Sequence, residues 1–222
     1  NPKFSLSDQC IQLAESNKAE HTFVLSSESL FWHLTDFIDQ KDQWHEAVEI
    51  QIILAVRELE EMLSSEYQQR VKRHGDSRPF EQFLKRRHFI SSHHKKAAEV
   101  LEQLSQENIS TTLINYSQDK SNISERVFEA IGAANLFPHE QMSGLVINRS
   151  LSQKELQILT MINALYYEQF PWISARLSDA LAKNLPNTET QRSRISHQSL
   201  EKLYETNENY IQTINRYLRS SE

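Results

Sequence analysis

Apolar residues along the chain recur at spacings of three and four, which is the period of an α-helix with one buried face. The clearest series contains five residues: Val48, Ile52, Ala55, Leu59 and Met62. This series predicts one long helix from about residue 42 to residue 73. Two shorter helices are expected before it, over residues 6–19 and 27–40.

A turn containing Gly75 ends the predicted long helix. Ser77 follows this turn and is expected to be the N-cap of a second helix over residues 78–107, which accepts Pro79 in its first turn. Two helices joined by so short a turn lie antiparallel. The pattern therefore predicts a long helical hairpin made of residues 42–73 and 78–107.

Two residue pairs in the second half of the chain have the spacing of a capping box: Asn122 with Glu125, and Ser152 with Glu155. They predict helices over residues 123–135 and 153–185. The apolar series of the second helix continues past Pro171, which removes a backbone donor, so a kink or break is expected there. Residues 137–150 show no sustained period and predict a loop, with extended backbone at residues 145–148.

The last predicted helix spans residues 196–219 and follows a polar stretch. Its narrow seam contains six residues: Leu200, Tyr204, Asn207, Ile211, Ile214 and Leu218. Burial of Asn207 costs about 1 to 3 kcal/mol unless its amide is hydrogen-bonded, and a polar residue in such a seam often selects one partner. We therefore divide the chain into a helical bundle domain, residues 1–186, and a polar linker with a docked or partner-binding helix, residues 187–222.

These patterns predict an all-α fold, an irregular bundle of six or seven helices with a long central antiparallel helical hairpin. The 222 residues are 38% hydrophobic and include three glycines, too few for glycine-rich nucleotide-binding loops. The longest apolar run is residues 52–56, whereas a membrane-spanning helix needs about 20 such residues, so no membrane insertion is expected. Cys10 is the only cysteine, which favours a reducing compartment and predicts a cytoplasmic protein.

The formal charge of −6 hides a segregation of charge along the predicted hairpin. Residues 36–66 contain nine acidic and two basic residues, and residues 70–96 contain nine basic and two acidic ones. An antiparallel hairpin brings the two segments together, with Glu66 near Lys85, so that their charges neutralise each other. A basic segment of this density also fits nucleic acid or an acidic protein partner, and both remain alternatives.

Patterns that resemble metal sites are incomplete in this sequence. His45 and Glu49 have the spacing of a zinc-protease motif, but Glu replaces the second histidine. The Glu-x-x-His pattern of di-iron bundles does not occur. Glu81 and His88, seven residues apart, would share one helical face, which is weak support for a metal site. We therefore expect no metal and no other cofactor.

Arg87 and His94 interrupt the apolar seam of the predicted 78–107 helix. A buried charge must be paired, so Arg87 is expected to meet a carboxylate from another helix or to reach solvent. His94 is expected to be a hydrogen-bonded core histidine. No catalytic residue is predicted.

The lack of an intact catalytic signature favours a non-enzymatic interaction subunit: an adaptor, chaperone-like or scaffold component of a larger assembly, such as a bacterial secretion system. Its partners would be other protein subunits. Seven residues are predicted to bind them: Arg86, Arg87, His94, Tyr204, Asn207, Ile211 and Leu218. The alternative function is a helical metal-dependent or haem-oxygenase-like oxidoreductase. A third is nucleic-acid binding through residues 70–96.

Overall fold

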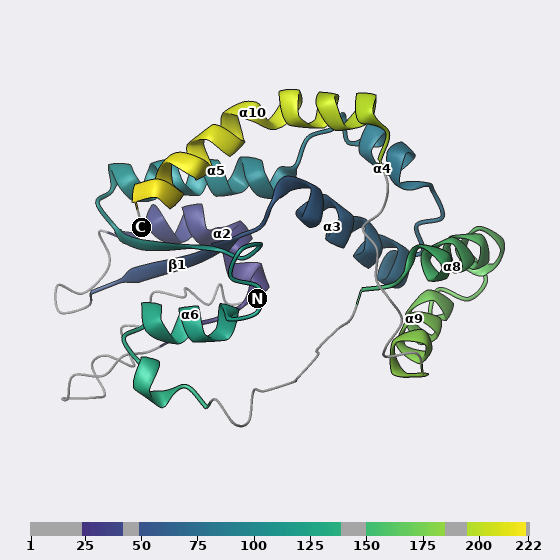
Figure 1. The fold of residues 1–222 in the computed structure, drawn as a ribbon, viewed down its shortest axis with the longest axis horizontal. Coiled ribbons are helices and arrows are strands. Elements are labelled where there is room, and N and C mark those ends of the chain that lie inside the picture. Colours follow the sequence, from purple (N-terminus) through teal and green to yellow (C-terminus); the bar gives the residue numbers. More distant parts are fainter. Residues whose placement is uncertain (1–23, 42–48, 139–149, 185–194, 221–222) are drawn as a thin grey trace.

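The computed structural model describes residues 24–41, 49–138, 150–184 and 195–220 of the chain. These residues form mostly helices, with one small sheet (Figure 1). In chain order the elements are α2 (Glu28–Ile38), β1 (Gln51–Val56), α3 (Leu59–His74), α4 (Phe80–Arg86), α5 (Ser92–Gln106), β2 (Ser110–Asn115), α6 (Ile123–Ala130), the short 3-10 helix η2 (Ala134–Leu136), α8 (Gln153–Tyr166), α9 (Ile173–Asn184) and α10 (His197–Ser220).

Strands β1 and β2 pair in parallel, with Gln51 opposite Ser110 and Val56 opposite Asn115. Parallel strands need a long crossover, and α3, α4 and α5 supply it. The fold is therefore mostly helical but not strictly all-α. The apolar run 52–56 forms β1, in which Leu54 is buried and Ala55 is exposed, because a short run rich in β-branched residues suits a half-buried strand.

The predicted long hairpin is wrong, because each of its helices is shorter than expected. The 42–73 helix begins only at Leu59, and residues 42–48 lie outside the described part of the chain. The 78–107 helix is broken into α4 and α5, since His88 and Phe89 have positive φ angles of 51° and 60°. Ser77 is not an N-cap, because Pro79 takes that position in α4.

Local signals in the other helices are largely confirmed. Ser152 and Glu155 form the predicted capping box at the start of α8, and Pro171 lies in a turn that separates α8 from α9. Asn122 precedes α6 but makes no side-chain cap, and α6 ends earlier than predicted. The predicted helix over residues 6–19 and extended segment over residues 145–148 lie outside the described residues.

The buried apolar side chains form two clusters. The first joins α3, α4 and α8, and the second joins α2, α5 and the sheet. Helix α10 contributes to both, through Leu203 in the first and Ile214 in the second, and it lies along α5 (Figure 1). Helix α10 is therefore packed against the rest of the described fold.

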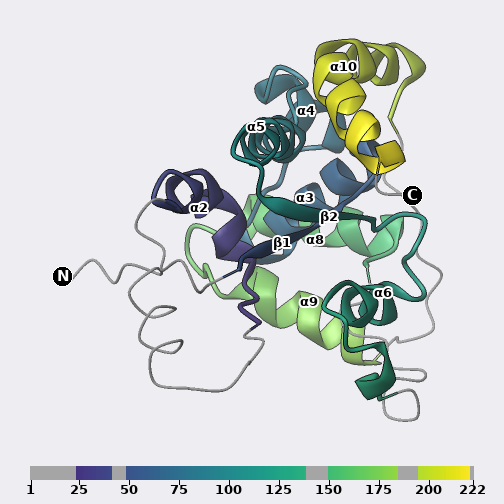
Figure 2. The ribbon, with the colours of Figure 1, turned by 90° about the vertical axis from the view of Figure 1, so that its left-hand side faces the viewer.

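The elements are spread along the long axis of the molecule (Figure 1). The sheet lies at one end, between α5 and α6, as a view turned by 90° also shows (Figure 2). Helices α8 and α9 lie at the other end and are connected to the rest by α3. No described helix is long and apolar enough to span a bilayer.

Candidate interaction surface

Helix α8 is apolar on two sides. One side carries Leu156 and Leu159, which are buried in the first cluster. The other side carries Ile158, Met161 and Leu165, which are 51%, 66% and 67% exposed. A surface helix of a globular protein normally has polar residues on its outer side. The outer side of α8 therefore differs from an ordinary solvated face.

The turn after α8 carries two further exposed aromatic residues. Phe170 and Trp172 are 43% and 61% exposed, and their rings lie 5.9 Å apart. We call the five exposed residues of the helix and the turn the α8 surface: Ile158, Met161, Leu165, Phe170 and Trp172. Exposed apolar residues that are scattered singly are normal, whereas a group of them often marks an interaction site.

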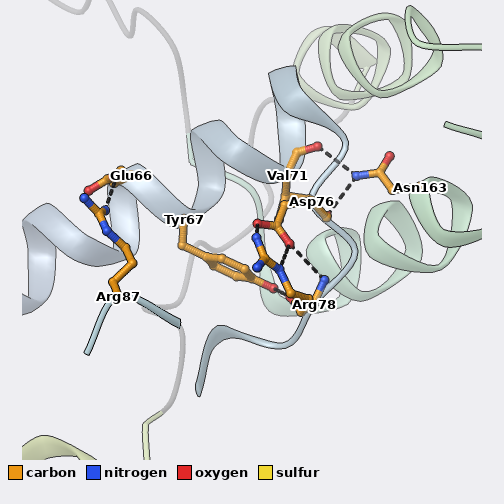
Figure 3. A network of polar contacts seen from close by, with 7 residues as sticks. All are labelled: Glu66, Tyr67, Val71, Asp76, Arg78, Arg87 and Asn163. Atoms are coloured by element: carbon orange, nitrogen blue, oxygen red, sulfur yellow. Dashed lines mark hydrogen bonds and ion pairs between the residues drawn. The ribbon is translucent and has the colours of Figure 1, made fainter. Parts of the chain in front are cut away.

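The side chain of Asn163 holds α8 in this orientation (Figure 3). Its amide nitrogen donates to the carbonyl of Val71 at 2.9 Å and to that of Asp76 at 3.1 Å. Its oxygen accepts a hydrogen bond from the Ser174 hydroxyl in α9. Because the last carbonyls of a helix lack partners within the helix, Asn163 both completes the end of α3 and ties α8 and α9 to it.

Three further contacts attach the α8–α9 pair to the fold. The backbone N–H of Leu151 donates to the Gln68 side chain at 2.9 Å. Arg73 donates two hydrogen bonds to Asp179 in α9, at 2.8 and 3.3 Å. Gly75 lies against the ring of Tyr167. These contacts fix which side of α8 enters the core and which side faces outward.

Polar groups in the α3–α4 turn bind one another (Figure 3). Arg78 donates to Asp76 through its backbone N–H, at 3.0 Å, and through its guanidinium. Burial raises the pKa of Asp76, but the hydrogen bonds and charge of Arg78 outweigh it and lower that pKa. The Tyr67 hydroxyl donates to the Arg78 carbonyl at 2.8 Å, and burial raises the pKa of Tyr67 to about 12. These groups stabilise the turn that supports Asn163.

The predicted carboxylate partner of Arg87 is confirmed as Glu66 of α3. Arg87 also donates to the Ser92 hydroxyl at 2.6 Å, and His93 Nδ1 lies 3.6 Å from the Glu66 carboxylate. Burial raises the pKa of Glu66, but His93 and Arg87 together lower it. The expected pairing of Glu66 with Lys85 is replaced by these contacts, because the break between α4 and α5 changes which residues face α3.

His94 is buried, and its Nδ1 lies 2.9 Å from the Ser91 hydroxyl oxygen. The pKa of His94 is lowered to about 4, mainly by burial and to a smaller extent by nearby His93, against the raising effect of a hydrogen bond with the backbone of Arg57. The residue therefore has the position expected of a hydrogen-bonded core histidine.

The basic segment 70–96 does not form one continuous helical face. It runs through the end of α3, the following turn, α4 and the start of α5. Its ion pairs include those of Arg73 with Asp179, Arg78 with Asp76, Arg87 with Glu66, and Lys95 with Glu99. Part of its charge is therefore neutralised within the chain.

The structure separates the candidate metal ligands that it describes. Helix α4 ends at Arg86, so the expected shared helical face of Glu81 and His88 does not exist. Glu81 instead accepts a hydrogen bond from the backbone N–H of Ser196 at 2.8 Å. His45 lies outside the described residues, as does Cys10. Among the described residues, no three His, Cys, Asp or Glu side chains are grouped as metal ligands.

The seven predicted partner-binding residues do not form one exposed surface. Arg86 is exposed, whereas Arg87 and His94 have the partners given above. Asn207 is fully buried, accepting a hydrogen bond from Ser91 N–H and donating to the Phe89 and Leu203 carbonyls. The other three pack against the two clusters: Tyr204 and Ile211 against the first, and Leu218 against the second.

The α8 surface was not predicted from the sequence, although a signal for it is present. Ile158, Met161 and Leu165 have helical spacing and form a second apolar series beside the one that predicted the core face. The sequence shows both series, but it does not show which of them is covered.

Comparison with known proteins adds no functional information. No protein-family model matches the chain, and searches of curated proteins and of solved structures found no significant similarity.

Proposed function

We propose that this protein is a non-enzymatic interaction subunit and that the α8 surface is its docking site. The observation that carries this proposal is a helix with two apolar sides, of which Asn163 fixes one toward the core and the other toward solvent. A large exposed apolar patch on a soluble fold typically marks a binding site. Adaptor, chaperone-like and scaffold roles, in a secretion system or in another cytoplasmic assembly, all require such a surface.

The composition of the α8 surface supports this proposal. Aromatic residues and Met are enriched in the centres of protein interfaces, whereas Lys, Glu and Asp are depleted there. Trp is also among the residues whose truncation most often costs binding energy. Trp172 is therefore expected to contribute strongly to binding.

Site-specific photo-crosslinking in the native cell tests this function. A photoreactive amino acid at Met161, on the α8 surface, should give a discrete protein adduct. The same amino acid at Glu205, an exposed residue of α10, serves as the control and should not give that adduct. Equal crosslinking from both positions, or none from Met161, Leu165 and Trp172, would contradict the proposal.

A further inference from the structure

We infer that the partner of the α8 surface is a second copy of this chain, bound with the two α8 helices antiparallel. This inference rests on the function proposed above, because it names the partner of the same surface. It follows from the spacing of the exposed residues, from the charges at the two ends of their series and from the symmetry of the resulting pair.

The exposed side of α8 carries a coiled-coil repeat. Five residues on it are spaced by four, three, four and three: Lys154, Ile158, Met161, Leu165 and Glu168. The helical turn continues past the end of α8, since Tyr167 N–H donates to the Asn163 carbonyl and Phe170 N–H to the Tyr166 carbonyl. Glu168 therefore lies on the same side as Lys154. Such a seam is the pattern by which helices pair side by side.

The charged residues at the two ends of this seam favour an antiparallel over a parallel pairing of two α8 helices. Lys154 and Glu168 are exposed, and each is seven residues from Met161. When two copies cross antiparallel at Met161, Lys154 of each copy lies at the level of Glu168 of the other, within about one helical turn. A parallel crossing would instead place like charges together. Complementary charges across an interface fix its register and disfavour other arrangements in this way.

The symmetry of a dimer also fits this seam. A two-fold axis through Met161 covers both seams at once and closes the assembly as a dimer. The opposite-charge contact then occurs twice, once at each end.

Analytical ultracentrifugation of the full chain tests this arrangement. The protein concentration is raised over about 1 to 100 µM, a range that covers weak to moderate association. The measured mass should rise from 26.0 kDa to twice that value. Met161→Glu places two carboxylates at the crossing point and should weaken the dimer at least about 100-fold. Circular dichroism should show an unchanged helix content, because Met161 is exposed.

Charge reversal provides the sharper test, since Lys154 and Glu168 are exposed and their substitution does not disturb the core. Lys154→Glu alone and Glu168→Lys alone should each weaken the dimer about tenfold. The double variant Lys154→Glu/Glu168→Lys recreates both pairs and should return the affinity to within about threefold of wild type. Glu205→Lys makes the same charge change as Glu168→Lys, but on α10. It is the matched control and should leave the affinity of the dimer unchanged.

Each outcome decides the inference. A chain that stays monomeric over the whole range, or a dimer that Met161→Glu leaves intact, overturns the second copy as partner. Failure of the double variant to recover overturns the antiparallel arrangement. A crosslinked adduct at Met161 with the mass of a different protein overturns this inference but supports the proposed function. The two can therefore fail separately.

Discussion

Gly75 and Tyr167 are in direct contact, although they belong to different turns that lie far apart in the sequence. A Cβ atom at position 75 would lie 2.2 Å from the Tyr167 ring, and the φ angle of Gly75 is +65°. Gly75, which ends α3, is therefore also the residue against which the turn after α8 packs. This contact links the stability of α3 to the placement of the α8 surface.

We predict that Gly75→Ala destabilises the protein by about 2 to 4 kcal/mol, because it combines left-handed backbone strain with displacement of the Tyr167 ring. Gly132→Ala is the matched control: Gly132 has a φ of +71° but no atom near its Cβ position. It should cost only about 1 kcal/mol. Urea unfolding of both variants measures the difference, and equal losses would contradict the role of Tyr167.

Asn163→Ala should destabilise the protein by about 2 to 4 kcal/mol. The substitution leaves the carbonyls of Val71 and Asp76 and the hydroxyl of Ser174 without their partner, and it opens a cavity beside α3. Gln157→Ala, at an exposed position of the same helix, should change the free energy of unfolding by no more than about 0.5 kcal/mol. A wild-type stability for Asn163→Ala would show that α8 is held by its apolar side alone.

Two of the ion pairs of α3 should differ in their contribution to stability. The Glu66 side chain is 14% exposed beside Arg87, whereas Asp179 is 62% exposed beside Arg73. Glu66→Gln removes the charge partner of a largely buried guanidinium and should cost about 1 to 3 kcal/mol. Asp179→Asn should cost about 0 to 1 kcal/mol. Thermal and urea unfolding measure both, and the reverse order would contradict this assignment.

His94 should make the protein less stable as the pH falls. Its pKa is about 4 in the folded chain, below the ordinary value of 6.5, so the unfolded state binds the proton first. The contribution of His94 to the free energy of unfolding is fully present above pH 6.5 and is lost as the pH falls toward 4. The free energy of unfolding should decrease by about 2 to 3 kcal/mol between pH 6.5 and 4.5. Burial of the neutral ring is the main cause.

Urea unfolding of wild type and His94→Gln across this pH range checks the prediction. The variant should show a nearly flat stability between pH 6.5 and 4.5. His33→Gln is the control, because His33 is exposed, and it should keep the wild-type slope. The lowered pKa values of Glu66 and Asp76 affect the free energy of unfolding only below about pH 4.5, because carboxylates lose their stabilising charge only there. An unchanged slope in His94→Gln would contradict the assignment.

Some elements could be predicted because their signals are local. The capping box of Ser152 and Glu155, the break at Pro171 and the boundaries of α10 depend on a few neighbouring residues. The carboxylate partner of Arg87 was also expected, because a charge in an apolar seam must be neutralised wherever it lies.

Other features depend on residues far away in the sequence. Strand β1 forms beside β2, about 60 residues later, and an apolar run alone does not distinguish a strand from a buried helix. The break between α4 and α5 contains neither Gly nor Pro. Asn207 of α10 stabilises it by accepting from Ser91 N–H and donating to the Phe89 carbonyl.

The sequence by itself determined a mostly helical fold, most helix boundaries and the two apolar series of α8, because period and capping are properties of adjacent residues. Only the tertiary structure decided which series is buried. Asn163 of α8 reaches the Val71 and Asp76 carbonyls at the end of α3, where unpaired backbone groups need a partner. That contact turns Leu159 toward the core and leaves Met161 exposed to solvent.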